Sequence, residues 1–430
     1  MRYPERWQQP LSAGDTIEEP ENGGMEDTMN VAVLGYGTVG SGVVEVLTEN
    51  QDSIDVKAGK ELRIKYILDL RDFPGDPYAD RVVHDVNVIM NDPEISVVCE
   101  VMGGVGAAYQ FTRQALEAGK SVCTSNKELV AKHGAELLQL AAEKNCNYMF
   151  EASVGGGIPI IRPLNTALTA EKILQVSGIV NGTTNYILTK MEREGADYEE
   201  VLRQAQALGY AERNPEADVE GYDACRKLAI LSSLMTGKNV DSEAIYTEGI
   251  TKITTADFEY AKAAGMSIKL LATSRAQEDG SVLAMVAPFL IGKENPLAMV
   301  NDVFNAVLVT GNMLGDAMFY GKGAGKLPTA SAVVADVIEC ARNQGRTLMC
   351  VWDREPAKLA DISEVKCAFF VRAAASARKE VEEVVAEGGS FVVSSRCEDF
   401  GYITQPMPEK EFRAKCEKLG GAVLNRIRLA

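Results

Sequence analysis

The sequence predicts an α/β protein with an N-terminal parallel-sheet domain, a central α+β domain and a shorter C-terminal module. Three observations lead to this prediction. Short apolar runs alternate with amphipathic stretches from residue 30 onward, a glycine-rich loop directly follows the first run, and the alternation stops near residue 155. Alternating strands and helices form parallel sheets with right-handed crossovers. At 430 residues the chain is long enough for two or three domains.

The first 28 residues are acidic, contain several prolines and glycines, and show no apolar period. Such a stretch buries too little apolar surface to offset its ordering entropy, so we predict a disordered extension over 1–28. It has no basic region followed by an apolar one, which argues against a secretion signal. Met1, Met25 and Met29 are the candidate start residues.

The first domain is predicted to span residues 29–154. Its apolar runs are typical of buried parallel strands and lie at 31–34, 64–68, 96–102, 121–123 and 148–150. Residues 107–118 and 128–144 carry apolar side chains at spacings of three and four, which predicts helices. A parallel sheet connected by helices follows from this order.

The central domain, residues 155–328, has a different rhythm. It reads as a strand at 173–180, helices at 186–194, 198–208 and 222–235, and β-rich stretches at 268–275 and 281–291. Residues 306–310 and 317–320 flank the turn residues Gly311 and Asn312, which predicts a hairpin. Within 329–350, a helix at 329–342 is expected to pack back on the first domain.

Residues 362–430 form the C-terminal module. Its predicted order is a strand (367–373), a helix (377–386), two strands (391–396 and 401–405), a helix (409–419) and a strand (422–429). This order is similar to that of a ferredoxin-like βαββαβ module.

Composition excludes several classes of function. The net charge of −17 argues against nucleic acid or an anionic membrane as the main partner. No run approaches the length of a membrane span. The nine scattered cysteines include no CxxC pair, which favours reduced thiols in a cytoplasmic protein. Because only two histidines occur, the catalytic acid and base are sought among Lys, Asp and Glu.

The glycine loop Gly35-Tyr36-Gly37-Thr38-Val39-Gly40 follows the first strand and opens a helix. This context predicts a Rossmann dinucleotide-binding domain, with the pyrophosphate at the helix N-terminus. A plain glycine-rich turn is the alternative. The second strand ends at Asp69 and Arg71, of which the acid would favour NAD and the arginine NADP, so the cofactor preference stays open.

Two further groups of polar residues are candidate site residues. Lys127 follows the fourth core strand, at the edge where ligands bind, although an ordinary surface lysine is the alternative. Asp223 and Lys227 are four residues apart and share a helix face, downstream of Glu212 and Asp218. A surface salt bridge is the usual meaning of such spacing. Here the pair leads into an apolar helix, which suggests a site that binds an ammonium group and positions a proton donor.

These motifs together resemble those of the homoserine dehydrogenase family over about residues 29–345. The resemblance rests on the glycine loop, Glu100 with Gly103-Gly104, Thr124 with Asn126-Lys127, Glu151-Ala152-Ser153-Val154-Gly155-Gly156-Gly157-Ile158-Pro159, Asn181-Gly182-Thr183-Thr184-Asn185, the stretch from Glu212 to Lys227, and Gly321-Lys322-Gly323-Ala324-Gly325-Lys326-Leu327-Pro328. It implies NAD(P)-dependent interconversion of homoserine and aspartate 4-semialdehyde by direct hydride transfer, in threonine and methionine biosynthesis.

The resemblance also implies residue roles. Lys227 would donate the proton to the aldehyde oxygen, Asp223 would orient it, and Lys127 would be a second essential lysine. Glu212 and Asp218 would bind the substrate's amino end. Implied dinucleotide contacts are Thr38, Val39, Gly103 and Gly323, beside Gly35, Gly37, Gly40 and Arg71. The Glu151 carboxylate, with the carbonyls of Val154, Gly156 and Ile158, would hold a monovalent cation, sodium or potassium.

Two departures from the family pattern matter. Asn214-Pro215 replaces the usual Asp-Pro. The C-terminal module has the element order of an ACT domain but lacks the acid-x-Pro-Gly-Val-Leu signature at 373–378. Whether threonine regulates the protein through this module therefore stays open, and the alternative is that the module serves only for dimerisation. The resemblance implies a homodimer of the stand-alone form, without an aspartokinase domain, and the module would offer a contact that joins dimers into a homotetramer.

Two other functions compete with this interpretation. An aldehyde-oxidising dehydrogenase would need a cysteine nucleophile, but neither Cys123 nor Cys146 has a histidine close in sequence to activate it. A dinucleotide or amino-acid sensor without catalysis is the other alternative, and the presence of both lysines and Asp223 argues against it.

Overall fold

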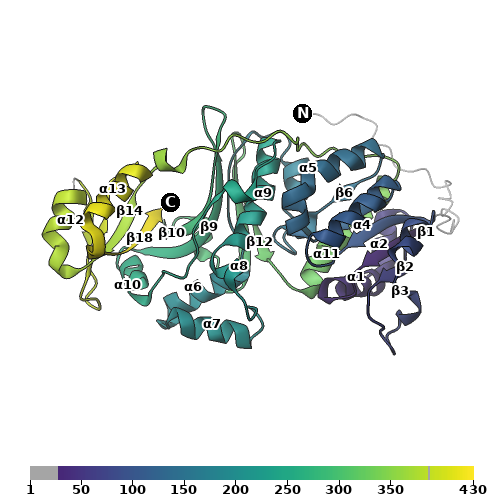
Figure 1. Cartoon of the computed structure of the whole chain (residues 1–430), viewed down its shortest axis with the longest axis horizontal. Coiled ribbons are helices and arrows are strands. Elements are labelled where there is room, and N and C mark those ends of the chain that lie inside the picture. The colour runs from purple at the N-terminus through teal and green to yellow at the C-terminus, as the bar shows by residue number, and fades with distance from the viewer. Residues whose placement is uncertain (1–27, 386–387) are drawn as a thin grey trace, which may run out of the picture.

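The structure is a computed structural model that describes residues 28–385 and 388–430. The predicted extension lies outside the described residues, except Thr28, which already belongs to the first strand. The N-terminal domain, the central domain and the C-terminal module follow one another along the long axis of the molecule (Figure 1). No described helix is both long enough and apolar enough to span a membrane.

The N-terminal domain is a six-stranded, fully parallel sheet in the order β3-β2-β1-β4-β5-β6. Its strands are β1 (Thr28–Leu34), β2 (Glu61–Leu68), β3 (Val82–Val83), β4 (Ile95–Glu100), β5 (Ser121–Thr124) and β6 (Tyr148–Met149). This Rossmann-like arrangement confirms the predicted fold class of the first domain. The two-residue strand β3 was not predicted, because two residues carry no readable apolar pattern.

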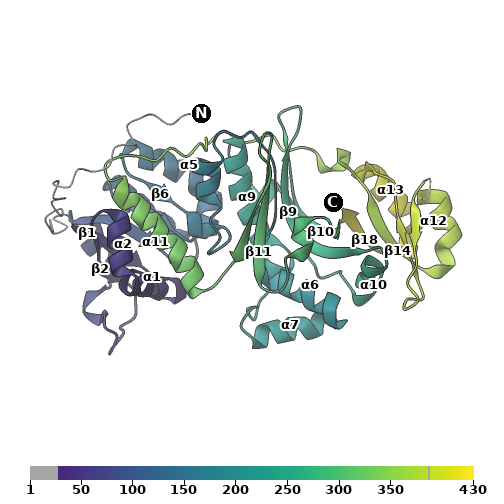
Figure 2. The same cartoon turned by 180° about the vertical axis from the view of Figure 1, so that it is seen from behind.

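Helices cover this sheet. They are α1 (Thr38–Glu49), α2 (Gln51–Ala58), α3 (Val86–Met90), α4 (Gly106–Glu117) and α5 (Lys127–Glu143). Helix α11 (Lys326–Arg342) returns from the central domain and packs along α1, as predicted, and its buried Val333 and Val337 join the same core as Val43 and Leu47. Figure 2 shows α11 lying across this face. Helices α2 and α3 were missed.

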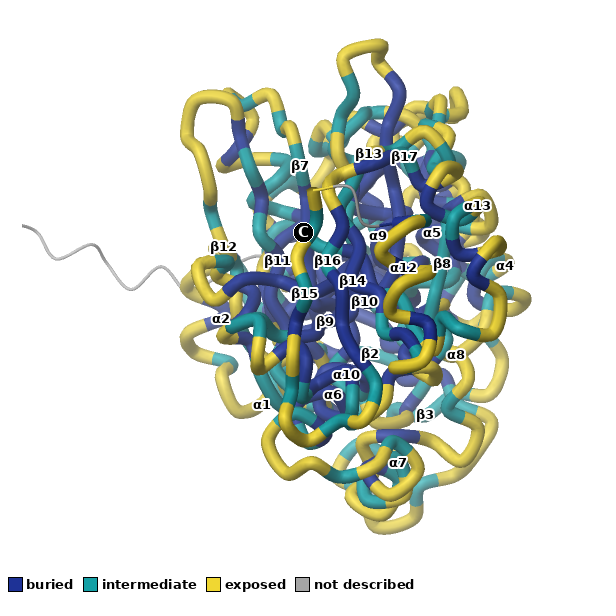
Figure 3. The backbone as a smooth tube through the Cα atoms, turned by 90° about the vertical axis from the view of Figure 1, so that its left-hand side faces the viewer, coloured by how far each residue is buried: buried dark blue, intermediate teal, exposed yellow. Residues whose placement is uncertain are grey.

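The central domain is built on a second sheet of the order β12-β11-β7-β9-β10, with helices on its face. Its elements are β7 (Ile173–Ile179), α6 (Gly182–Glu194), α7 (Tyr198–Ala207), α8 (Glu216–Val219), α9 (Tyr222–Thr236), β8 (Tyr246–Thr247), α10 (Thr255–Ala263), β9 (Met266–Ala276), β10 (Val282–Gly292), β11 (Phe304–Gly311) and β12 (Gly315–Lys322). The predicted hairpin is confirmed as β11 and β12. Every residue of β10 is buried, whereas the outer strand β12 is largely exposed (Figure 3).

The C-terminal module has the predicted element order. Its elements are β14 (Phe369–Ala373), α12 (Arg378–Val385), β15 (Ser390–Val392), β16 (Phe400–Ile403), α13 (Glu409–Leu419) and β18 (Val423–Leu429), with a small ladder of β13 (Lys366–Cys367) and β17 (Met407–Pro408). The second strand is shorter than the predicted 391–396. Strand β18 also pairs in parallel with β10, so the sheet of the module continues that of the central domain.

Candidate active site

The glycine loop lies between β1 and α1, as the sequence predicts. Gly35 has φ of +96°, in the left-handed region that favours glycine. A Cβ on Gly40 would lie 1.8 Å from the Gly35 carbonyl oxygen, so the helix reaches the strand this closely only without a side chain there. Gly37 precedes α1, whose first residues are Thr38 and Val39. The free N–H groups of this helix N-terminus are suited to a pyrophosphate.

Asp69 and Arg71 lie together at the end of β2. The Asp69 carboxylate accepts hydrogen bonds from the Tyr36 N–H at 2.9 Å and from the Arg71 guanidinium at 3.0 Å. Bonding to Arg71 holds the pKa of Asp69 well below its usual range. The arginine stacks over the Phe73 ring and stays largely exposed. Both candidate determinants of cofactor choice therefore occupy one position beside the glycine loop.

The two lysines and Asp223 come together between the two domains. Asp223 is 4% exposed and lies at the start of α9. One of its carboxylate oxygens is 2.6 Å from Lys227 Nζ, and the other is 2.5 Å from Lys127 Nζ. Burial alone would raise the pKa of Asp223, but the two ammonium groups outweigh burial and hold it below its usual range. A surface salt bridge, the alternative for this pair, is thus wrong.

Lys227 is the buried member of this cluster, with 9% of its surface exposed. Its ammonium donates to Asp223 and, at 2.7 Å, to the Val180 carbonyl oxygen. No other acceptor contacts it in the described part of the chain, so its third N–H is available. Burial lowers the pKa of Lys227 despite the Asp223 charge, and the neighbouring Lys127 adds to that effect. A buried lysine with a lowered pKa is suited to exchanging a proton with a bound molecule.

Asn181 connects Asp223 to Asp218. Its side-chain amide donates to Asp223 Oδ2 at 2.8 Å and to Asp218 Oδ1 at 2.7 Å, while its carbonyl oxygen caps α6. Burial raises the pKa of Asp218. Asn181 was noted only as part of a motif, and its role in orienting two carboxylates was missed. Glu212, the other expected substrate ligand, is exposed in the loop before α8.

Glu100 is a fully buried carboxylate that links the two loops flanking Lys127. Its side chain accepts from Thr124 Oγ1 at 2.6 Å and from the Met102 N–H at 2.9 Å. Thr124 in turn accepts from the Asn126 N–H, and Asn126 caps α5, whose first residue is Lys127. Burial raises the pKa of Glu100 to about 7.

Replacing Glu100 with glutamine should alter the pH dependence of stability. The folded protein holds the Glu100 proton up to about pH 7, whereas the unfolded chain releases it near the usual pKa of 4.5. Wild type therefore loses stability through this group as pH rises across that window, by about 3 kcal/mol, and the glutamine variant does not. Urea unfolding of both proteins from pH 4.5 to 7.5 measures the difference. Glu117→Gln, on the surface of α4, is the control, and equal slopes for Glu100→Gln and wild type would contradict the prediction.

Glu151 follows β6 in a glycine-rich turn and is buried. Its carboxylate accepts from three backbone N–H groups, those of Ile160 at 2.6 Å, Ile161 at 2.9 Å and Arg162 at 2.7 Å. These bonds take most of the acceptor positions of the carboxylate but leave one lone pair of Oε2 without a donor among them. A cation held by Glu151 together with the backbone carbonyls of Val154, Gly156 and Ile158 therefore stays a prediction.

The loop from Gly321 to Gly325 lies against this turn. A Cβ on Gly156 would lie 2.5 Å from the Gly323 carbonyl oxygen, and one on Gly323 would collide with the Asn305 side chain. Gly103, in contrast, has open space at its Cβ position, near the end of β4. The glycines expected to contact the dinucleotide therefore lie in two different places. Gly323 lies where two backbone segments cross closely, and Gly103 lies at an open strand end.

Comparison with known proteins agrees with this geometry. Residues 35–151 match the family model described as the NAD-binding domain of homoserine dehydrogenase, and residues 159–338 match that of homoserine dehydrogenase itself. The chain is 45% identical over 320 residues to a homoserine dehydrogenase of Bacillus subtilis, with 73% of each chain covered. It is 41% identical over 359 residues to that of Helicobacter pylori, with 83% of this chain and 84% of the relative covered.

Solved structures extend the likeness to the C-terminal module. A homoserine dehydrogenase from Thiobacillus denitrificans superposes with a TM-score of 0.86 at 36% identity, covering 94% of this chain and 98% of that one. A hyperthermophilic archaeal homoserine dehydrogenase in complex with NADPH gives a TM-score of 0.62 at 28% identity, covering 73% of this chain and 98% of that one. The chain belongs to the homoserine dehydrogenase family of NAD(P)-dependent oxidoreductases.

Proposed function

We propose that the cluster of Lys127, Asp223 and Lys227 performs the family's reaction, the interconversion of L-homoserine and L-aspartate 4-semialdehyde in threonine and methionine biosynthesis. The observation that carries the proposal is the available third N–H of Lys227, a buried ammonium fixed by two acceptors. A bound nicotinamide supplies or accepts the hydride. Lys227 donates to the carbonyl oxygen as negative charge grows there and then delivers the proton.

Asp223 keeps both ammonium groups in place. Its two oxygens are each within ion-pair distance of one lysine, so Lys227 is oriented by Asp223 and Val180, and Lys127 by Asp223. Side-chain exposure differs, at 37% for Lys127 and 11% for Lys227. We assign to Lys127 the contact with nicotinamide and substrate, and to Lys227 the proton transfer.

Asp218 is the better supported ligand for the amino group of the substrate. It is half-buried, is held by Asn181, and lies close enough to Lys127 and Lys227 for their charges to affect its pKa. Glu212 is exposed in the loop before α8, and no side-chain contact joins it to the cluster in the described residues, so we assign it a secondary part.

Function and cofactor use are tested by one spectrophotometric assay of homoserine oxidation with NAD and NADP side by side. We expect turnover of homoserine and none of 2-aminobutyrate, which lacks the reacting hydroxyl. Binding of a dinucleotide without turnover would move the assignment to a sensor. Running the assay in sodium, potassium and tetramethylammonium buffers tests the proposed monovalent cation on Glu151 and the carbonyls of Val154, Gly156 and Ile158.

We further propose that NADP is accepted and that Arg71 holds its 2′-phosphate. The archaeal relative with bound NADPH supports this choice. Arg71→Gln should raise the KM for NADP by about tenfold, because a charge-assisted contact is lost. The KM for NAD should stay the same or fall, since Asp69 is freed to bind the ribose hydroxyls. An equal rise for both dinucleotides would contradict this assignment.

We also propose a homodimer in the cytoplasm. The edge strand β12 exposes Met318 (43%) and Tyr320 (53%), and the adjoining turn exposes Met313 (81%), an apolar surface that a second copy would cover. All nine cysteines are unpaired, as in a reducing compartment. The ACT-like assignment of the C-terminal module and its part in a homotetramer are also proposals. A solution mass of two or four chains tests the oligomeric state.

A further inference from the structure

The candidate site is assembled from two domains. Lys127 is the first residue of α5 in the N-terminal domain, whereas Asp223 and Lys227 belong to α9 in the central domain. A second ion pair, between Glu128 and Arg226 at 3.4 Å, joins the same ends of the two helices. The placement of Lys127 relative to Asp223 therefore depends on how the two domains are held together.

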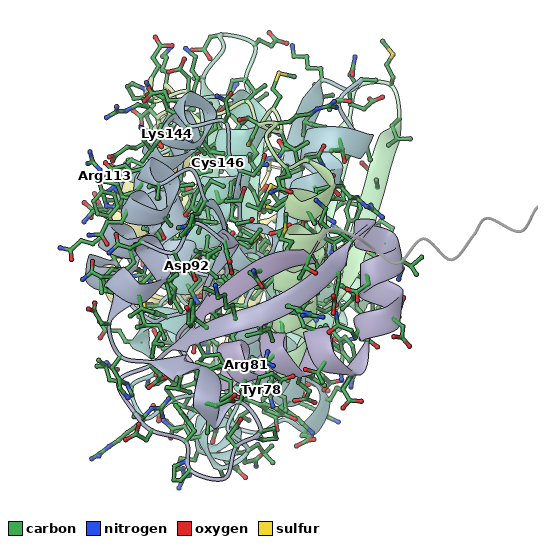
Figure 4. All side chains as sticks on the ribbon, turned by 90° about the vertical axis from the view of Figure 1, so that its right-hand side faces the viewer. Tyr78, Arg81, Asp92, Arg113, Lys144 and Cys146 are labelled. Carbon is green, nitrogen blue, oxygen red and sulfur yellow. The ribbon has the colours of Figure 1, made fainter. Side chains whose placement is uncertain are left out.

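One segment bridges both domains beside these helices. Residues 343–361, here called the strap, leave α11 and run to the C-terminal module (Figures 1 and 2). The strap crosses along the top in both views, while the connection from β12 to α11 crosses lower down. At its start, the Asn147 side chain bonds the backbone of Arg346 and Leu348 at 2.9 and 2.8 Å. The Thr347 hydroxyl donates to the backbone carbonyl of Cys146, which is labelled near the top of the N-terminal domain in Figure 4.

The strap then binds the segment that ends α9. The Asp353 N–H donates to the Gly237 carbonyl at 2.8 Å, and the Asn239 N–H donates to the Glu355 carbonyl at 2.9 Å. The Ala357 N–H returns a bond to the Asn239 carbonyl at 2.8 Å. These are backbone bonds of the strand type, so the strap and the end of α9 are expected to move together.

Trp352 is a strap residue that contacts both α5 and the segment after α9. It is 6% exposed, and its ring lies so close to α5 that a Cβ on Gly134 would be 2.9 Å from a ring carbon. Its indole N–H donates to Asn239 Oδ1 at 3.2 Å. The ring also meets Phe150 edge-on, with centroids 6.0 Å apart. One rigid side chain thus contacts α5, the segment that directly follows α9, and Phe150, which precedes Glu151.

We propose that Trp352 is a positioning residue that sets the spacing of α5 and α9 and thereby holds Lys127 against Asp223. The inference rests on the proposed roles of these site residues. A buried aromatic ring is large and loses few rotamers, so it fixes spacing at low entropic cost. Misplacement of a reacting group by about 1 Å from a distant change can cost roughly 10²-fold in rate.

The test compares Trp352→Ala, Trp352→Phe and Asn239→Ala with wild type in homoserine oxidation by the full chain. We expect Trp352→Ala to lower kcat by between about 10- and 100-fold with the dissociation constant of the dinucleotide changed less than about twofold. Trp352→Phe should recover part of kcat, since it keeps an aromatic ring between the helices but lacks the distal indole carbons that lie nearest Gly134, and Asn239→Ala should lose less than Trp352→Ala. Met349→Ala, which removes an exposed strap side chain, is the matched control and should behave as wild type.

A double-mutant cycle with Lys127→Ala separates this inference from the proposed function. If Trp352 acts through Lys127, Trp352→Ala should cost no further kcat in the Lys127→Ala background. Full additivity, or wild-type kcat in Trp352→Ala below its unfolding temperature, would overturn the positioning role. If Lys127→Ala alone left turnover unchanged, the proposed site itself would be wrong, whatever Trp352 does.

Discussion

Replacing Lys227 with alanine should lower kcat for homoserine oxidation by on the order of 10³-fold or more, because the group that exchanges the proton and stabilises charge on oxygen is lost. Dinucleotide binding should be kept, since Lys227 lies on α9, outside the N-terminal domain that carries the glycine loop. Steady-state kinetics and dinucleotide titration of the same preparations measure the two effects. The variant leaves Asp223 paired with Lys127, so no carboxylate is stranded.

The matched control is Lys190→Ala, which removes a half-buried lysine from an i,i+4 pair with Glu194 on α6. It should retain the wild-type kcat. Adding methylamine to Lys227→Ala should restore part of the lost rate, as the small ammonium can enter the vacated space. A kcat for Lys227→Ala within about tenfold of wild type would contradict its role in general acid–base catalysis, where it accepts the hydroxyl proton in this direction and donates it in the reverse one.

Replacing Asp223 with asparagine should both destabilise the protein and abolish most turnover. The isosteric change removes the charge that lies between two ammonium groups, and breaking a buried ion pair in this way costs about 3–5 kcal/mol. The two lysines then repel each other across a buried site, so both should lose protons more readily. Urea unfolding and kinetics at pH 7 are the measurements.

A double variant sharpens the Asp223 test. Adding Lys127→Met to Asp223→Asn removes one of the two unpaired charges, so it should recover part of the lost stability, while activity stays low. Asp69→Asn is a useful comparison, because that carboxylate is paired with a largely exposed arginine. If Asp223→Asn unfolded at the same urea concentration as wild type, the ammonium groups could not be charged at neutral pH as described.

Local patterns predicted much of this molecule. The glycine loop followed by a helix fixed the first domain, because that turn geometry requires glycine at Gly35 and Gly40. The four-residue spacing of Asp223 and Lys227 placed both on one helix face. Most regular strands and helices were found, with errors of up to four residues at their ends, where the apolar period fades, but helices α2, α3 and α10 were missed.

Contacts between distant segments could not be read in this way. The Val180 carbonyl and Asn181 reach Asp223 and Lys227 only because β7 ends beside α9, which no spacing reports. The resemblance implied a cation role for the Glu151 carboxylate, but no spacing in the sequence predicts that three backbone N–H groups, at 160–162, also bond it. The pairing of β18 with β10 could not be predicted either, because the alternation of apolar and polar residues in a strand does not depend on which strand lies beside it.

The pairing of β18 with β10 has a consequence for biosynthesis. Strand β10 is buried over its whole length, and one part of its edge is covered by β18, where Phe289 and Leu290 pair with Arg428 and Leu429. During translation, β18 emerges about 130 residues after β10, a delay of roughly 7 to 26 s at ordinary elongation rates. For that interval the backbone groups of Phe289 and Leu290 have no partner on that side of the strand, and an open apolar edge of this kind is prone to pair with another chain. Yield in cells should therefore respond to elongation speed and chaperone supply more strongly than the stability of the finished protein would suggest.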